Sequence, residues 1–171
     1  MHPTQATKVS CGWIKKGHDK AIETTGSRTR LNLVGAINLN ELAAAQVKRY
    51  DKVNGETIQH FFTELRANNH SDKRIHVVLD GAGYHRSQDV KNKAQALNIA
   101  LHYLPPYSPN LNPIERLWKV MNEYVRNNKY FATAKEFRDK IDEFFSETLP
   151  TIGDILSTRI NDNFQVLKSA S

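Results

Sequence analysis

The sequence has 171 residues, enough for one domain with a sizeable hydrophobic core. Hydrophobic residues make up 39% and charged residues 25%, as in an ordinary globular protein, and no apolar run approaches the ~20 residues of a membrane span. A single cysteine, Cys11, excludes an internal disulfide. Because the N-terminus also lacks the apolar core of a signal peptide, we expect a cytoplasmic protein.

The formal net charge of +6 is unevenly distributed along the chain. Residues 1–50 hold eight Lys and Arg against three Asp and Glu, residues 51–100 hold seven against six, and the rest hold nine against nine. A positive field concentrated in the first third suits a polyanion such as DNA or RNA, and it also suits a solvated surface. Charge alone leaves both interpretations open.

The first fifty residues favour β-strands. A short strand is expected over residues 9–14, and the alternation of residues 29–39 predicts another, with Leu31 and Leu33 on its apolar face. Residues 45–53 alternate weakly and are polar enough for the edge of a sheet. Several strands therefore precede the first expected helix.

Helices and strands alternate in the middle of the chain. Residues 56–68 have apolar side chains at helical spacing, and Asn54 before them is a favourable N-cap. The short apolar runs 75–80 and 99–105 are typical of strands covered on both faces. Between them we expect a helix over residues 88–97.

Ser87 can cap the helix expected over residues 88–97. Helices dominate the rest of the chain, and one is expected from Pro113 to about Asn127. Residues 133–136, TAKE, form a capping box that begins a further helix. A helical turn and a polar tail are expected over residues 150–171. The order of elements predicts a single α/β domain with a mixed sheet flanked by helices.

Asp80 is the first candidate functional residue. It stands at the carboxyl end of an expected strand, where ligands collect in open α/β sheets. Gly81 and Gly83 then allow a sharp turn or a close approach to a ligand. Asp-Gly is also a common turn dipeptide, so an Asp80 bonded to its own backbone remains an alternative.

Glu115 is the second candidate. It lies in LPPYSPNLNPIERLW, residues 104–118, whose four prolines form a stiff connector before a helix. Asn112 suits the N-cap and Pro113 the first helical position. A capping box with Asn112 and an ion pair with Lys119 are structural alternatives for the Glu115 carboxylate.

Two acids on rigid elements near a basic field suit phosphate chemistry with a divalent cation. Mg²⁺ prefers carboxylate oxygens together with substrate phosphates. Paired metal ions ~4 Å apart can activate an attacking oxygen and stabilise a leaving one. Asp80 and Glu115 are therefore candidate catalytic and metal-binding residues.

The motifs around both acids resemble a known family. LDGAGYHRS, followed further along by LPPYSPNLNPIERLW, is similar to the catalytic domain of IS630-type transposases, relatives of the Tc1/mariner elements. HPTQATKVSCGWIKKG and TGSRTRLNLVGAINL are similar to the same family. The resemblance covers about residues 2–150 and leaves 151–171 as a C-terminal extension.

This resemblance implies a ribonuclease H-like fold and a DDE or DDD triad that holds Mg²⁺ or Mn²⁺. Asp80 would be the second acid and Glu115 the third. Such enzymes hydrolyse the ends of the element and join the freed 3′ hydroxyls to target DNA by transesterification. The implied partners are double-stranded transposon ends and target DNA, and a second subunit in the full-length protein. The implied location is the nucleoid of a bacterial cytoplasm.

The first Asp of the family's triad is not found in this sequence. In that family it ends a strand just before the HPT segment, which here is residues 2–4. Asp19, in an expected loop, and Asp51, in a polar strand, do not substitute for it. The preceding helix-turn-helix region is not found either. We therefore expect a truncated or split transposase that lacks its central strand, has unpaired strand edges and is inactive alone.

Several polar residues are candidate DNA contacts, each with an ordinary alternative. Basic side chains are usually just solvated, and a histidine is often satisfied by nearby backbone. Trp118 is assigned to the core and Cys11 to no chemistry. The candidate DNA contacts are Lys15, Lys16, Lys20, Arg28, Arg30, His85, Arg86 and Lys119.

Two other functions remain open. One is a DNA-binding or assembly fragment without catalysis. The other is a ribonuclease H-like, metal-dependent nuclease that hydrolyses DNA without joining it. Both share the fold expected for a transposase, so the site has to distinguish them.

Overall fold

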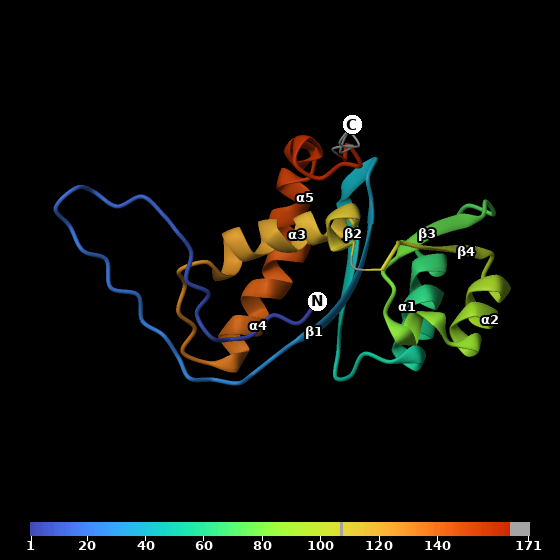
Figure 1. Ribbon diagram of the computed structural model, residues 1–171, viewed down its shortest axis with the longest axis horizontal. Helices are drawn as coiled ribbons and strands as arrows, with labels where there is room; N and C mark the ends of the chain where they lie inside the picture. Colours follow the sequence, from blue (N-terminus) through green and yellow to red (C-terminus); the bar gives the residue numbers. More distant parts are fainter. Residues whose placement is uncertain (107, 165–171) are drawn as a thin grey trace, which may run out of the picture.

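The computed structural model describes residues 1–106 and 108–164 (Figure 1). It has mixed α/β architecture, which confirms the class predicted from the order of elements. Within the described residues, the strands form two separate two-stranded sheets, β1-β2 and β3-β4. No described helix is long and apolar enough to cross a membrane.

The first sheet is an antiparallel pair. β1, Asn32–Asn38, pairs with β2, Glu41–Tyr50, and the register shifts between Ala36 and Asn38. Leu33 is only 3% exposed, as its place in the alternating pattern predicted. Both strands expected in this region are confirmed, although β2 begins earlier than its weak pattern indicated.

The second sheet is a parallel pair formed by β3, Ile75–Leu79, and β4, Ile99–Tyr103. Helices α1, Gly55–Ala67, and α2, Gln88–Ala96, lie together beside it (Figure 1). The expected cover on both faces is wrong for β3, because both helices pack into the same apolar cluster. Val78, on the other face, is 54% exposed.

The starts of α1 and α2 differ in their capping. The Asn54 side chain accepts a hydrogen bond from the Thr57 N–H, and the Thr57 hydroxyl accepts one from the Asn54 N–H, which confirms the cap. Ser87 stands at the N-cap of α2 but makes no side-chain cap bond. Its hydroxyl instead donates to the Tyr84 carbonyl at 3.4 Å. Ser87 therefore occupies the predicted N-cap position, but the prediction that its side chain caps the helix is wrong.

The C-terminal helices pack against the first sheet. They are α3, Ile114–Met121, α4, Ala134–Glu143, and α5, Leu149–Ile152. α3 and α4 each continue into a π-helical stretch, Asn122–Arg126 and Phe144–Thr148 respectively. A 3₁₀ turn, Asp154–Thr158, follows α5, and the end of the expected polar tail lies outside the described residues.

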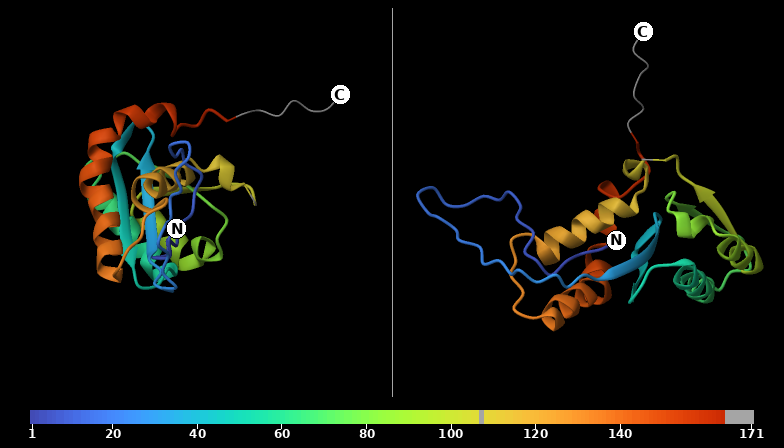
Figure 2. Two further views of the ribbon diagram at one scale, coloured as in Figure 1. Left: turned by 90° about the vertical axis from the view of Figure 1, so that its left-hand side faces the viewer. Right: turned by 60° about the horizontal axis from the view of Figure 1, so that its bottom comes forward.

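Two apolar clusters accompany the two sheets. One joins β1 and β2 to α3, α4 and α5 and contains the fully buried Phe137 and Ile141. The other joins β3 and β4 to α1 and α2 around Ile58 and Phe62. Figure 2 shows these two parts from two further directions.

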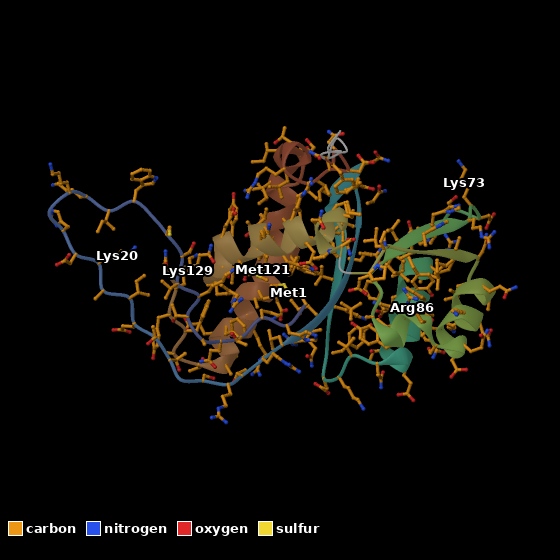
Figure 3. All side chains as sticks on the ribbon, viewed as in Figure 1. Met1, Lys20, Lys73, Arg86, Met121 and Lys129 are labelled. Atoms are coloured by element: carbon orange, nitrogen blue, oxygen red, sulfur yellow. The ribbon has the colours of Figure 1, made fainter. Side chains whose placement is uncertain are left out.

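The N-terminal segment crosses from the first sheet into a long loop. Thr4 forms an antiparallel bridge with Arg30, and Lys8 forms a parallel bridge with Asn127. The strand expected over residues 9–14 is wrong, because this stretch has no strand partner and extends away from the core (Figures 1 and 3). Its apolar side chains are accordingly exposed, including Val9 and Trp13.

Candidate active site

Asp80 begins the turn that follows β3. Its Oδ1 accepts a hydrogen bond from the Ala82 N–H at 3.1 Å and lies 3.3 Å from the His85 Nε2. The bond to Ala82 is the local turn considered as an alternative role. The side chain is nevertheless 59% exposed, so the carboxylate keeps oxygen lone pairs free for another ligand.

His85, which contacts that carboxylate, lies on the 3₁₀ turn Gly83–Arg86. Its side chain is 12% exposed, and its buried Nδ1 has no hydrogen-bond partner among the described residues. Burial lowers the pKa of His85, and the negative charge of Asp80 opposes that shift. The Tyr103 hydroxyl donates to the His85 carbonyl at 2.9 Å, which anchors this turn to β4.

Glu115 lies in the first turn of α3. The Asn112 side chain accepts a bond from the Ile114 N–H at 3.3 Å, and the Glu115 N–H donates to the Asn112 carbonyl. The capping box considered for Asn112 and Glu115 is therefore not formed. Within residues 1–106 and 108–164, the exposed Glu115 carboxylate forms no ion pair, so the suggested pair with Lys119 is also not observed.

Both candidate acids line one cavity of about 790 Å³. Asp80 reaches it from the end of β3 and Glu115 from the start of α3, and Met1 also lines it. Burial lowers the pKa of the Met1 amino group, whereas the negative charges of Glu115 and Asp80 oppose that shift. Both carboxylates therefore act electrostatically on the Met1 amino group, although burial has the larger effect.

The Met1 amino group is the part of this arrangement that sequence reasoning missed. It donates a 2.8 Å hydrogen bond to the Leu33 carbonyl of β1, and Met1 lines the cavity. Figure 3 shows Met1 beside β1. No motif signals this contact, because it depends on how the first residues pair with a strand thirty residues later. Within the described residues, no group of three or more His, Cys, Asp or Glu side chains could hold a metal ion together.

The candidate DNA contacts are scattered. Arg86 stacks over the Tyr103 ring with its guanidinium carbon 5.3 Å from the ring centroid, and Lys119 is exposed on α3. Trp118 is only 5% exposed and packs edge-on against Phe145, which confirms its place in the core. Only His85 of the candidate DNA contacts lines the cavity. The exposed basic residues of the projecting loop and its base are Lys15, Lys16, Lys20, Arg28 and Arg30.

The two two-stranded sheets and their helices form a mixed α/β domain that matches the ribonuclease H-like fold of a solved transposase catalytic domain. The solved catalytic domain of the Mos1 mariner transposase has the same fold, with a TM-score of 0.57, 16% identity, and coverage of 86% of this chain and 82% of that one. The Mos1 strand transfer complex matches with a TM-score of 0.64 and 16% identity over 96% of this chain and 54% of that chain.

Sequence comparison then gives the family. The model of the DDE superfamily endonucleases matches residues 1–138, and the chain belongs to this family of enzymes. An insertion element IS630 39 kDa protein of Shigella sonnei is 23% identical over 85% of this chain, and the protein y4pE/y4sA of Sinorhizobium fredii is 33% identical over 44%. The matches span 43% and 54% of the lengths of those two proteins.

Proposed function

We propose that this chain is the catalytic domain of a DNA transposase that cuts DNA strands and transfers them to a target with a divalent cation. The single observation that carries the proposal is that Asp80 and Glu115, from separate elements, line one cavity. Membership of the DDE superfamily endonucleases supports the reaction class. Structures of Mos1 paired-end complexes with Mn and with Mg match this fold, and they suggest the same metals here.

The donor set fits Mg²⁺ or Mn²⁺. Both acids are exposed carboxylates, and hard divalent cations take oxygen ligands. Their negative charges oppose the lowering of the Met1 amino pKa by burial, although burial has the larger effect. The metal would polarise phosphate oxygens and lower the pKa of an attacking water or hydroxyl. Asp80 and Glu115 would hold it, and His85 would fix the Asp80 carboxylate by its 3.3 Å contact.

A third carboxylate would complete the site. Two monodentate acids leave most positions around an octahedral cation to water and phosphate, which weakens binding. We infer that the chain alone binds metal weakly and lacks strand-transfer activity. This inference rests on the described residues, among which no group of three or more His, Cys, Asp or Glu side chains could hold a metal ion together.

DNA would reach the acids through basic side chains. Arg86 and Lys119 stand nearest to them in sequence and are exposed, whereas the lysines of the projecting loop would hold DNA further away. Phosphate contacts of this kind position a duplex without reading its sequence. Cutting two transposon ends would need two active sites, so we propose a homodimer for the active assembly.

Metal binding by the two acids is the first test. We expect Mn²⁺ to bind the chain, and Asp80→Asn or Glu115→Gln to weaken that binding by about tenfold or more, as measured by electron paramagnetic resonance of free Mn²⁺. Glu147→Gln, an exposed acid outside the cavity, is the matched control and leaves binding unchanged. Equal Mn²⁺ binding by all variants would rule out the proposed metal site.

Strand transfer distinguishes the transposase from its two alternatives. The chain is given an N-terminal extension that ends in Asp and is mixed with 3′-hydroxyl DNA ends and a target plasmid. This protein should give joined DNA product, whereas the same chain with an extension that ends in Asn should not. Hydrolysis without joining would favour a nuclease. DNA binding without either reaction would favour an assembly fragment.

A further inference from the structure

Two histidines lie side by side on the face of the second sheet that α1 and α2 leave uncovered. Alternate residues of β3 and β4, such as Val77 and Leu101, pack with these two helices. The residues between them point to the opposite face, because side chains alternate along a strand. His76, Val78 and His102 therefore share that face, and all three are exposed.

The register of the sheet brings the two imidazole rings together. Val78 pairs with His102 and His76 pairs with Ala100, so the histidines lie diagonally across the two strands. The Nδ1 of His76 lies 2.9 Å from the Nε2 of His102, which is a hydrogen-bond distance. Because both residues belong to paired strands, the fold holds two ring nitrogens close together on a regular backbone.

The two rings meet end to end and not face to face. Their centroids are 5.1 Å apart and their planes differ by 18°. This separation is close to the largest that a 2.9 Å contact between ring nitrogens permits, so both nitrogens lie nearly on the line between the centroids. When both rings are neutral, one nitrogen therefore donates its proton to the lone pair of the other.

The separation of the two nitrogens suits a metal ion in place of that proton. Imidazole nitrogen binds Zn²⁺ at about 2.0–2.1 Å. Two such bonds at an angle of roughly 90–110° put their nitrogens ~2.9–3.4 Å apart, and the observed 2.9 Å lies within this range. A turn of each exposed ring then aims both lone pairs at one ion, while the nitrogens stay nearly where they are.

We propose that His76 and His102 form a binding site for a late first-row divalent metal ion, namely Zn²⁺, Ni²⁺ or Cu²⁺. Neutral imidazole suits these metals, whereas carboxylates such as Asp80 and Glu115 suit Mg²⁺ and Mn²⁺. In the described part of the chain, no group of three or more His, Cys, Asp or Glu side chains could hold a metal ion together, so water completes the coordination. The ion links β3 to β4 and stabilises this pair, since a two-stranded sheet is marginal alone.

Zinc binding to the full chain tests the site. The tested chain carries Asp80→Asn and Glu115→Gln, so that the carboxylates proposed for catalysis do not supply the signal. We expect one Zn²⁺ per chain in isothermal titration calorimetry, and His76→Ala or His102→Ala added to this chain should weaken binding at least tenfold. Both changes together should weaken it little further than either one, because the loss of either ring already ends the chelation.

His70→Ala is the matched control, because His70 is also exposed and lies just before β3. This variant should keep its zinc affinity, and its melting temperature should rise with zinc concentration, whereas that of the His76→Ala variant should not. Equal zinc affinity with and without His76, or an equal loss in the His70 variant, would overturn the proposal. So would zinc binding that leaves the imidazole NMR resonances of His76 and His102 unshifted. These outcomes are independent of the proposed reaction, since both of its acids are replaced in the tested chain.

Discussion

Gly153 shows how closely one backbone approaches another at a single residue. A Cβ at this position would lie 2.6 Å from the Ala43 backbone nitrogen of β2 and 2.7 Å from its Cα. Real Cβ atoms do not approach backbone so closely, and backbone cannot rotate away as a side chain can. Gly153 thus sets the distance between β2 and the turn that follows α5.

We expect Gly153→Ala to destabilise the protein by about 1–3 kcal/mol, because the added methyl group overpacks a backbone contact. Urea unfolding monitored by circular dichroism measures the change. Gly26→Ala adds the same group where nothing lies within 4 Å, and its unfolding midpoint should stay near that of the unmodified chain. Equal midpoints for the two variants would contradict this account of Gly153.

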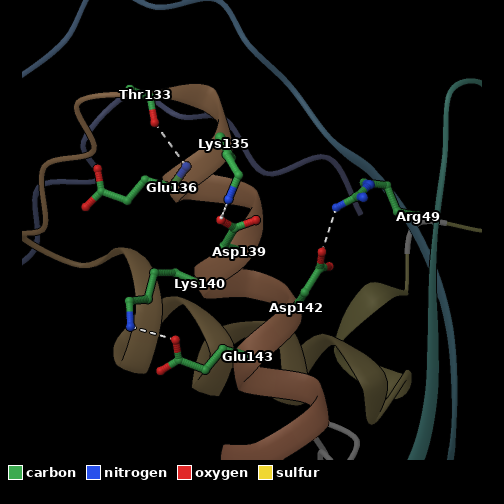
Figure 4. A network of polar contacts seen from close by, with 8 residues as sticks. All are labelled: Arg49, Thr133, Lys135, Glu136, Asp139, Lys140, Asp142 and Glu143. Atoms are coloured by element: carbon green, nitrogen blue, oxygen red, sulfur yellow. Dashed lines mark hydrogen bonds and ion pairs between the residues drawn. The ribbon is translucent and has the colours of Figure 1, made fainter.

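α4 is the element whose start is best defined by its own sequence. Thr133 accepts a hydrogen bond from the Glu136 N–H at 3.1 Å (Figure 4). The Glu136 carboxylate accepts from the Ala132 N–H. The Thr133 cap is thus confirmed, but the full capping box expected for TAKE is not formed, because Glu136 bonds the Ala132 N–H in place of the Thr133 N–H. The helix then buries Phe137 and Ile141 against the first sheet.

Thr133→Ala removes this cap and should cost about 1 kcal/mol of unfolding free energy. Thr24→Ala, an exposed loop position, is the matched control and should cost almost nothing. The surface ion pairs of the same helix, such as Lys135 with Asp139, contribute less because both partners are largely exposed (Figure 4). A larger effect at Lys135→Ala than at Thr133→Ala would reverse this ranking.

Across the whole molecule, positive charge and the two acids occupy different places. The projecting loop, with the labelled Lys20, extends away from the core (Figures 1 and 3), whereas Asp80 and Glu115 line the cavity. Such a separation suits a long polyanion, which can contact the loop and the cavity together. It does not suit a small anionic substrate that would fit the cavity alone.

If the loop binds DNA, Lys15, Lys16 and Lys20 contribute to the salt dependence of affinity. Replacing all three with alanine should lower the slope of log K against log salt by up to ~0.9 per lost phosphate contact. A variant of equal charge change, with alanine at the exposed Lys52, Lys73 and Lys91, should keep its slope. Fluorescence anisotropy with a DNA duplex at several salt concentrations measures both, and equal slopes would remove the loop from the interface.

Local patterns determined most elements because their causes are local. The alternation of apolar and polar residues placed Leu33 on a buried face. The Asn54 and Thr133 caps depend only on side chains that accept hydrogen bonds from backbone N–H groups three residues later. Residues 9–14 failed as a strand because a strand needs a partner edge, which the segment does not meet. β3 failed as a strand covered on both faces for a similar reason, since helices reach one side only.

The sequence alone determined the candidate acids, the family resemblance and the order of helices and strands, because residue type and spacing carry that information. Only the tertiary structure decided that Asp80 and Glu115 share one cavity and that the Met1 ammonium lies within their field. It also decided that β1 and β3, which belong to different sheets, both line that cavity. These features depend on contacts between residues far apart in the chain, which no local pattern encodes.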